Sequence, residues 1–384
     1  MALRDVLDET APYPIRQLLY SYLTIPDICL LGRMCKSFRW LPKHLSRSLL
    51  NIDTHLQPFI TDPQRFRDRL GRFDGIISRG FALNFFFSGC QKTPYLDVFV
   101  EKGVKADAFV CFLKLEELYE LPESQHHVDD EVRETILLRN AERQTTIRLT
   151  LTNGFPLLHI LQTACATAEL NFITRDKAYS LFPSLTIHQH KFYLLRRLDD
   201  DSGCRLSEYA HHGWTTRDVM WPDWTDKMKL KGKGCRRVGH RFSLVVELPG
   251  NFGTPSSTPH YVIEHAQFGI QGTVYMTRPN RGKRRDDEFE LEAKPFTSHA
   301  LRHCYTIANS WSWGYFLSGR LERWLMMELF KMGHENRPGP LTPNTPYYSF
   351  KVSLPLSITP PSTWDHADDQ VPIWYAEWAA DRRW

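Results

Sequence analysis

Features that mark secreted and membrane proteins are missing from this sequence of 384 residues. Its start, MALRDVLDET, is charged from the fourth residue onward, so we expect no signal peptide. No apolar run approaches the roughly 20 residues of a membrane-spanning helix, so we expect no membrane partner. The eight cysteines are scattered and form no CxxC pair, which favours reduced thiols over disulfides or a zinc site. We therefore expect a cytoplasmic or nuclear protein.

Strong charge of either sign is also missing, because the formal net charge is only +4. The basic runs KLKGKGCRR (229–237) and RPNRGKRR (278–285) contain no aromatic residues for base stacking, and the second is followed at once by acidic residues. We therefore do not expect a nucleic-acid partner. Hydrophobic residues at 42% and charged residues at 24% are typical of a globular protein, and aromatic residues at 13% predict large cores.

Strand patterns and helix patterns follow one another along the chain. Tyr95 to Glu101 is rich in Val, Phe and Tyr, and Thr145 to Thr152 alternates between polar and apolar residues, so both are predicted to be strands. Lys105 to Tyr119 has helical spacing, with Leu115 and Leu118 expected on its inner face. Residues 128–140 fit either a strand or a helix. Similar patterns predict strands at 73–78, 242–248, 260–265, 273–277 and 348–354, and helices at 81–87, 155–163, 164–172, 298–332 and 373–384. Strands mixed with helices in this way predict an α+β fold.

One carboxylate interrupts the apolar strand TPYLDVFVEK (93–102). Side chains alternate along a strand, so Tyr95, Asp97 and Phe99 share one face, and Leu96 and Val98 lie on the other. Burying a carboxylate is costly unless it is paired, hydrogen-bonded or bound to a metal ion. Asp97 is therefore the remains of a metal site, a working part of one, or the polar end of an edge strand.

Residues 11–41, APYPIRQLLYSYLTIPDICLLGRMCKSFRWL, have the spacing of two or three short helices, with a break and a new helix start at Pro26-Asp27. The segment resembles an F-box, although Ala11 and Pro14 depart from that motif. The matching positions are Pro12, Ile15, Leu19, Leu23, Asp27, Ile28, Leu31, Met34, Cys35, Lys36, Phe38 and Leu41. A helical cap packed on the rest of the chain is the alternative.

The F-box resemblance implies binding to the F-box adaptor protein and, through it, to a cullin ubiquitin ligase. Helices of this kind dock through an apolar face with a polar rim. The side chains expected to bind the partner are Pro12, Ile15, Leu19, Leu23, Ile28, Leu31, Cys35 and Phe38.

A second resemblance begins at IISRGFAL (76–83), about fifteen residues before the strand that contains Asp97. This arrangement is similar to the nucleotidyltransferase fold of the polymerase β type. That family places Gly-Ser at the start of a helix, Asp-x-Asp on the next strand and a third carboxylate on a later strand. The resemblance implies that backbone N–H groups hold a nucleotide and that the carboxylates hold Mg²⁺ ions.

The family's site residues are mostly replaced in this chain. Gly-Ser corresponds to Arg79-Gly80, the first Asp to Tyr95, and only the second Asp is retained, as Asp97. The later strand, TTIRLTLT (145–152), offers no carboxylate. We therefore expect a vestigial nucleotide site at Ser78, Arg79, Gly80 and Asp97, with no catalytic residues, metal or cofactor. Arg79 is expected to pair with Asp97 or with solvent.

LNFITRDKAYSLFPSLTIHQHKF (170–192) also resembles a group of fungal proteins in which such a core often follows an F-box. The expected organisation is an F-box-like helical module at 9–50, a degenerate nucleotidyltransferase-like core at 73–245, and an α+β region at 246–384 packed on the core. The sequence thus predicts a non-enzymatic ubiquitin-ligase subunit that recognises an unknown target protein. The alternatives are a divergent Mg²⁺-dependent nucleotidyltransferase or nucleotide-binding protein, and a binding module of another kind.

Overall fold

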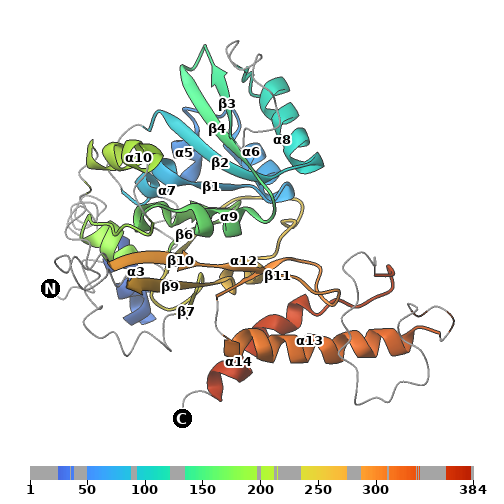
Figure 1. The fold of residues 1–384 in the computed structure, drawn as a ribbon. Helices are drawn as coiled ribbons and strands as arrows, with labels where there is room; N and C mark the ends of the chain where they lie inside the picture. The colour runs from blue at the N-terminus through green and yellow to red at the C-terminus, as the bar shows by residue number, and fades with distance from the viewer. Residues whose placement is uncertain are drawn as a thin grey trace, which may run out of the picture.

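The computed structural model describes residues 25–34, 36–38, 50–87, 93–121, 135–196, 200–211, 214, 235–274, 287–308, 311–333, 335, 337 and 360–381. Helices and β-sheets are both well represented in these residues, which confirms the α+β class (Figure 1). None of the described helices combines the length and the apolar character that crossing a membrane requires. Five predicted partner-binding residues lie outside the described residues: Pro12, Ile15, Leu19, Leu23 and Cys35. The strand predicted at 348–354 does too.

A mixed sheet of seven strands organises the described part of the chain, in the order β3-β4-β2-β1-β5-β6-β8. Its strands are β1 (Ile76–Ser78), β2 (Tyr95–Glu101), β3 (Thr135–Asn140), β4 (Thr145–Thr152), β5 (Asn171–Ile173), β6 (Lys177–Ser180) and β8 (Leu244–Glu247). β2 and β4 pair in parallel, whereas the other neighbours pair antiparallel. The bounds predicted for β2 and β4 are confirmed at both ends, and the open segment 128–140 contains a strand.

Two smaller sheets accompany the large one. One has the order β10-β9-β7, formed by β7 (Cys235–Arg237), β9 (Gln267–Val274) and β10 (Asp287–Glu292). The other pairs β11 (Lys294–Phe296) with β12 (Tyr305–Ile307).

The helices surround these sheets. They are α3 (Ile25–Met34), α5 (Ile52–Leu56), α6 (Pro63–Arg72), α7 (Arg79–Phe85), α8 (Val104–Leu115), α9 (Pro156–Thr163), α10 (Asp200–His211), α12 (His260–Glu264), α13 (Trp311–Lys331) and α14 (Val371–Ala380). Shorter turns of helix are η1 (Lys36–Phe38), η3 (Thr167–Glu169), η4 (Ser184–His188) and η8 (Asp368–Gln370). Figure 1 shows α13 and α14 against each other near the C-terminal end, away from the seven-stranded sheet.

Apolar cores lie on both faces of the large sheet. On one face, Leu96 and Val98 join a core with Phe66 of α6 and Phe109 of α8. On the other face, Phe99 joins a second core that includes residues of α9 and β9. A strand buried on both faces cannot slip by one residue without exchanging its two sets of side chains. The face on which Asp97 lies is therefore fixed by the fold.

Four expectations from the sequence are wrong. Residues 260–265 form α12, which begins after Pro259, and 164–172 form η3 and the start of β5 because that segment pairs with β1. The long helix begins at Trp311, since Tyr305–Ile307 belong to β12. Leu115 and Leu118 are exposed, because α8 ends at Leu115 and Tyr119 takes the inward position.

The described N-terminal helix packs on the body of the protein. α3 begins at the expected position, with Asp27 in its first turn. Ile28 and Phe38 are buried in the same core as Leu96, and Leu31 packs against that core. Ile28 and Phe38, predicted to bind a partner, thus hold this segment on the protein itself. The boundary proposed at residue 245 falls within β8.

A buried arginine joins distant segments on one side of this core. Arg67 of α6 is 1% exposed. Its guanidinium donates to Asp53 Oδ1 at 2.8 Å and to the backbone carbonyls of Arg175, Leu248 and Pro249. Burial lowers the pKa of Arg67, and the contact with Asp53 opposes that shift. The arginine therefore connects α5, α6 and the loops after β5 and β8.

Replacing Arg67 with methionine should lower the free energy of unfolding by about 3–5 kcal/mol, because Asp53 and the carbonyls lose a buried partner. Urea denaturation followed by circular dichroism measures this loss. Arg72→Met is the matched control, since Arg72 pairs with Asp68 at the surface of the same helix, and it should cost less than about 1 kcal/mol. Equal losses for the two variants would contradict the role given to Arg67.

Candidate functional site

The site forms where three neighbouring strands meet. β1 ends at Ser78, which lies opposite Asp97 in the antiparallel pair of β1 and β2. Asp97 in turn lies opposite Arg148 in the parallel pair of β2 and β4. Alternation along β4 places Arg148 on the same face as Thr146 and Thr150, while Ile147 and Leu149 enter the core. Strand register therefore brings Asp97 of β2 next to Arg148, the one cation of β4.

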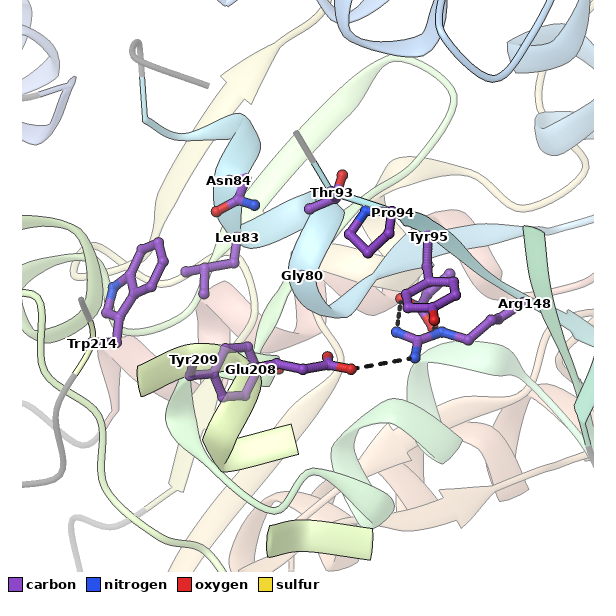
Figure 2. Close-up of a pocket in the computed structure, with 11 residues that line it drawn as sticks. Gly80, Leu83, Asn84, Thr93, Pro94, Tyr95, Arg148, Glu208, Tyr209 and Trp214 are labelled. Carbon is purple, nitrogen blue, oxygen red and sulfur yellow. Dashed lines mark hydrogen bonds and ion pairs between the residues drawn. The ribbon is translucent and has the colours of Figure 1, made fainter. Parts of the chain in front are cut away.

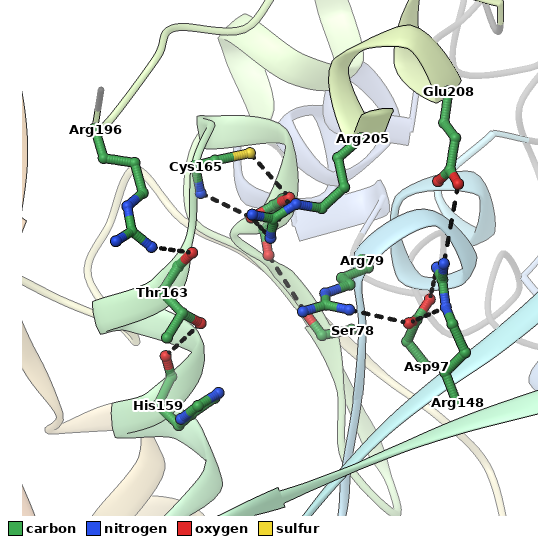
Figure 3. A network of polar contacts seen from close by, with 11 residues as sticks. Ser78, Arg79, Asp97, Arg148, His159, Thr163, Cys165, Arg196, Arg205 and Glu208 are labelled. Carbon is green, nitrogen blue, oxygen red and sulfur yellow. Dashed lines mark hydrogen bonds and ion pairs between the residues drawn. The ribbon is translucent and has the colours of Figure 1, made fainter. Parts of the chain in front are cut away.

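Asp97 and Arg148 form a two-pronged ion pair (Figure 3). Arg148 Nε donates to Asp97 Oδ1 at 2.7 Å, and Arg148 Nη2 donates to Oδ2 at 2.7 Å. The Asp97 residue is 1% exposed. Burial by itself would lower the pKa of Arg148, but the charge of Asp97 and the hydrogen bonds to it raise that pKa above its ordinary value. Paired hydrogen bonds of this geometry are among the strongest that a carboxylate makes.

Arg79 supplies a second cation to the same carboxylate. Its Nη1 lies 3.4 Å from Asp97 Oδ1, and its guanidinium carbon lies 5.1 Å from the centre of the Phe99 ring. The pairing of Arg79 with Asp97 was one of the two arrangements expected from the sequence. Arg79 begins α7 with φ of 61°, a left-handed conformation that glycine adopts freely and that costs other residues about 1–2 kcal/mol.

Tyr95 completes this face of β2. The guanidinium carbon of Arg148 lies 4.3 Å from the centre of the Tyr95 ring, so the arginine stacks on the ring while it pairs with Asp97. The predicted resemblance to nucleotidyltransferases aligns Tyr95 with the first aspartate of that family. In the structure this ring supports a guanidinium instead of binding a metal ion.

Helix α10 brings two further charged side chains to the site. Glu208 Oε1 lies 3.9 Å from Arg148 Nη1, and Arg205 Nη1 lies 3.3 Å from Glu169 Oε1. Glu169 also accepts from the backbone N–H of Cys165 at 2.8 Å and from its thiol at 3.1 Å. Three carboxylates and three guanidinium groups therefore face one another in this part of the structure, and their formal charges cancel.

The nearby thiol and phenol are not ionised at neutral pH. Burial, with a contribution from the negative charge of Glu169, raises the pKa of Cys165 to about 12. Burial also raises the pKa of Tyr209 well above its usual range, with Glu169 again contributing. A thiol acts as a nucleophile through its thiolate, so Cys165 is unreactive at neutral pH.

A cavity opens beside the ion pair (Figure 2). Its space amounts to about 470 Å³, including the part open to solvent. Its lining combines α7, β2, β4 and α10 with one aromatic residue that follows α10: Gly80, Leu83, Asn84, Thr93, Pro94, Tyr95, Asp97, Arg148, Glu208, Tyr209 and Trp214. The charges that border it are already paired, so it offers no excess negative potential to a cation.

This arrangement does not provide the chemistry of a two-metal site. Both oxygens of Asp97 accept hydrogen bonds from arginines. Within the described residues, no group of three or more His, Cys, Asp or Glu side chains is placed to hold a metal ion. Mg²⁺ needs several oxygen ligands, and a catalytic pair of ions needs more.

The structure brings together the residues predicted to form a vestigial site, Ser78, Arg79, Gly80 and Asp97. The polar side chains among them bond to other groups of the protein. Ser78 is buried, and its hydroxyl donates to the carbonyls of Glu169 and Asn171 at 3.2 and 3.0 Å. Gly80 borders the cavity, and a Cβ added there would meet Thr93 only at an ordinary distance of 3.9 Å. Sequence reasoning missed Arg148, Glu169, Arg205 and Glu208. Only Arg148 had a visible signal, as the one charged residue of TTIRLTLT.

Comparisons with known proteins do not identify this chain: no family model, no curated protein and no solved structure matches it. The F-box and nucleotidyltransferase resemblances therefore stay predictions drawn from the residues. What can be said of the site rests on its geometry.

The pair between Asp97 and Arg148 should contribute strongly to stability, because removing either partner leaves a buried charge. Arg148→Met and Asp97→Leu should each lower the free energy of unfolding by about 3–5 kcal/mol. The double variant should lose clearly less than the sum of the two, since it leaves fewer unpaired charges. A double-mutant cycle measured by urea denaturation gives the coupling energy.

The exposed pair of Arg320 and Glu377 is the control for that cycle, because its atoms lie 2.8 Å apart but in contact with solvent. Arg320→Met and Glu377→Leu should show a coupling energy below about 1 kcal/mol. A coupling between Asp97 and Arg148 as small as that of the control would contradict the structural role of the buried pair.

Proposed function

We propose that this chain is an F-box-type interaction protein, a substrate-recognition subunit of a cullin-type ubiquitin ligase. Its nucleotidyltransferase-like body is catalytically inactive and presents a binding surface to a target protein. The ion pair of Arg148 with Asp97 is the observation that best supports an inactive body. Arg148 pairs with Asp97, the one carboxylate that this chain retains from the metal site of the nucleotidyltransferase pattern.

The energetics of the pair favour this proposal. A metal ion at Asp97 would have to displace Arg148 and Arg79 from a carboxylate that is 1% exposed. Separating a buried pair leaves uncompensated charges and costs about 3–5 kcal/mol before any metal ligand is gained. At the other positions of the nucleotidyltransferase pattern, this chain has Tyr95, Arg79 and Gly80. None of these residues supplies a carboxylate.

The alternative, a Mg²⁺-dependent nucleotidyltransferase, makes a distinct prediction. If the body is inactive, isothermal titration calorimetry of the full chain with each nucleoside triphosphate and Mg²⁺ should show no binding heat. Asp97→Asn keeps the shape of the side chain while removing its charge, and it should give the same result as the wild type. Mg²⁺-dependent binding that Asp97→Asn abolishes, with an unchanged circular dichroism spectrum, would support the enzyme instead.

The F-box part of the proposal relies on the matching motif positions and on the outward face of α3. Leu30 and Met34 lie one turn apart on this helix and are 54% and 74% exposed, while Ile28 is buried. Such an arrangement leaves an apolar face for helix docking while the inner face holds α3 on the body.

Replacing both Leu30 and Met34 with aspartate should abolish co-purification of the F-box adaptor, as should the pair Ile15→Asp and Leu19→Asp. Tyr315→Asp is the control, because Tyr315 is 84% exposed on α13, far along the chain, and should retain the adaptor. Affinity purification with mass spectrometry of the bound proteins gives the readout. Undiminished adaptor recovery with both double variants would rule out the F-box assignment.

A further inference from the structure

The outer face of α8 carries apolar side chains that face solvent. Val104 is 85% exposed and Leu115 is 78% exposed. Cys111 is also exposed, and Ala108 is half-buried between them. In Figure 1, α8 lies at the periphery, and none of the described helices or strands lies on its outer side. We call these residues (Val104, Ala108, Cys111 and Leu115) the outer stripe of α8.

The outer stripe has the spacing of a helix–helix contact. Its residues are separated by four, three and four positions, the alternation with which apolar residues repeat in coiled coils. The opposite face of the same helix is already buried, because it packs into the core through Ala106, Phe109, Phe112 and Leu113. A surface helix ordinarily has one apolar face, so a second one on α8 indicates a contact outside this chain's own core.

Two charged residues beside the outer stripe indicate which partner this face contacts. Asp107 and Lys114 flank the outer stripe on the same side, seven residues apart, and both are exposed. Neither forms an ion pair with any described residue. If two copies of α8 lie antiparallel, Asp107 of one copy approaches Lys114 of the other, and symmetry creates the pair twice. A parallel arrangement would instead place the same flank of each copy on opposite sides of the contact, so that Asp107 and Lys114 would not meet.

We propose that the outer stripe of α8 is a self-association surface, on which α8 of a second copy of this chain packs antiparallel. In this arrangement Val104 of each copy meets Leu115 of the other, and Ala108 meets Cys111. The small side chains at the centre let the two helix axes approach closely. The contact is two-fold symmetric, so each copy uses the same residues.

The size of the surface sets the strength of the dimer. α8 has 12 residues and is therefore about 18 Å long. Stable interfaces usually bury more than about 1,000 Å², which a single helix of this length does not supply. The dimer is therefore reversible and concentration-dependent, and it weakens as salt screens the two ion pairs.

Charge reversal tests the proposal on the full chain. Sedimentation velocity over a range of concentrations should show a monomer–dimer equilibrium for the wild type. Asp107→Lys and Lys114→Asp should each weaken it roughly tenfold or more, because each turns both attractive pairs into repulsive ones. The double variant Asp107→Lys, Lys114→Asp should return the dissociation constant to within about threefold of the wild-type value, since the pairs re-form with their signs exchanged.

Leu115→Glu should also abolish the dimer without unfolding the protein, because Leu115 lies at the surface. Tyr315→Glu is its control, since Tyr315 is equally exposed on a different helix and should leave the equilibrium unchanged. Circular dichroism verifies that each variant is folded. A wild type that stays monomeric at every concentration, or a dimer that survives Leu115→Glu, overturns the proposal. Failure of the double charge reversal to restore the dimer overturns the antiparallel arrangement.

Cross-linking provides a second, independent readout of the same contact. Cys111 of one copy lies near Cys111 of the other in the antiparallel arrangement, so a short bis-maleimide should yield a covalent dimer. Cys204 is exposed as well, and therefore serves as the comparison. The covalent dimer should disappear with Cys111→Ser and persist with Cys204→Ser. The reverse pattern contradicts a contact through α8.

Discussion

Asp97 lies in the middle of β2, a strand that is buried on both faces. The need to pair this buried carboxylate constrains the arrangement of the strands and helices around it. Leu96 and Val98 are committed to the core on one side of β2, so Asp97 must project from the other side. It cannot reach solvent there and needs a partner within the protein. The parallel pairing of β2 with β4 supplies one, because it places Arg148 directly opposite. The neutralisation of Asp97 is therefore set by strand register as well as by side-chain choice.

The surrounding polar groups extend that pairing into a connected set. Arg148 reaches Glu208 of α10, and Arg205 of the same helix reaches Glu169, next to β5. Glu169 also accepts the thiol of Cys165, and its backbone carbonyl accepts the hydroxyl of Ser78. Satisfied networks of this kind make a buried arrangement rigid, whereas a partly satisfied one would destabilise it. The ion pairs of Arg148 and Glu169 with α10 thereby hold that helix beside the ends of the strands.

The sequence predicted secondary structure well where the local residue pattern agrees with burial in the fold. It failed where pairing with another segment of the chain decides the conformation. β2 and β4 could be predicted to the residue, because β2 is rich in Val, Phe and Tyr and β4 alternates between polar and apolar residues over eight positions. Residues 164–172 and 260–265 could not, since such short apolar segments fit a strand or a helix equally well and tertiary pairing makes the choice. Asp97 was identified as needing a partner, and Arg79 was named as one. Arg148 was not, because nothing in the sequence states which strand lies beside β2. A single cation in β4 and a carboxylate in the middle of β2 were the available signal.

Two helices of this protein share a design in which one face is anchored and the other is left apolar and exposed. In α3, Ile28 enters the core while Leu30 and Met34 face solvent; in α8, Phe109 enters the core while Val104 and Leu115 face solvent. A helix held on a rigid core loses less conformational entropy when a partner binds than a free segment does. The proposed adaptor surface and the proposed dimer surface both benefit from this anchoring. They also both depend on the core that contains Leu96 and Val98, so the same packing that buries Asp97 with its arginines keeps the two outward faces in place.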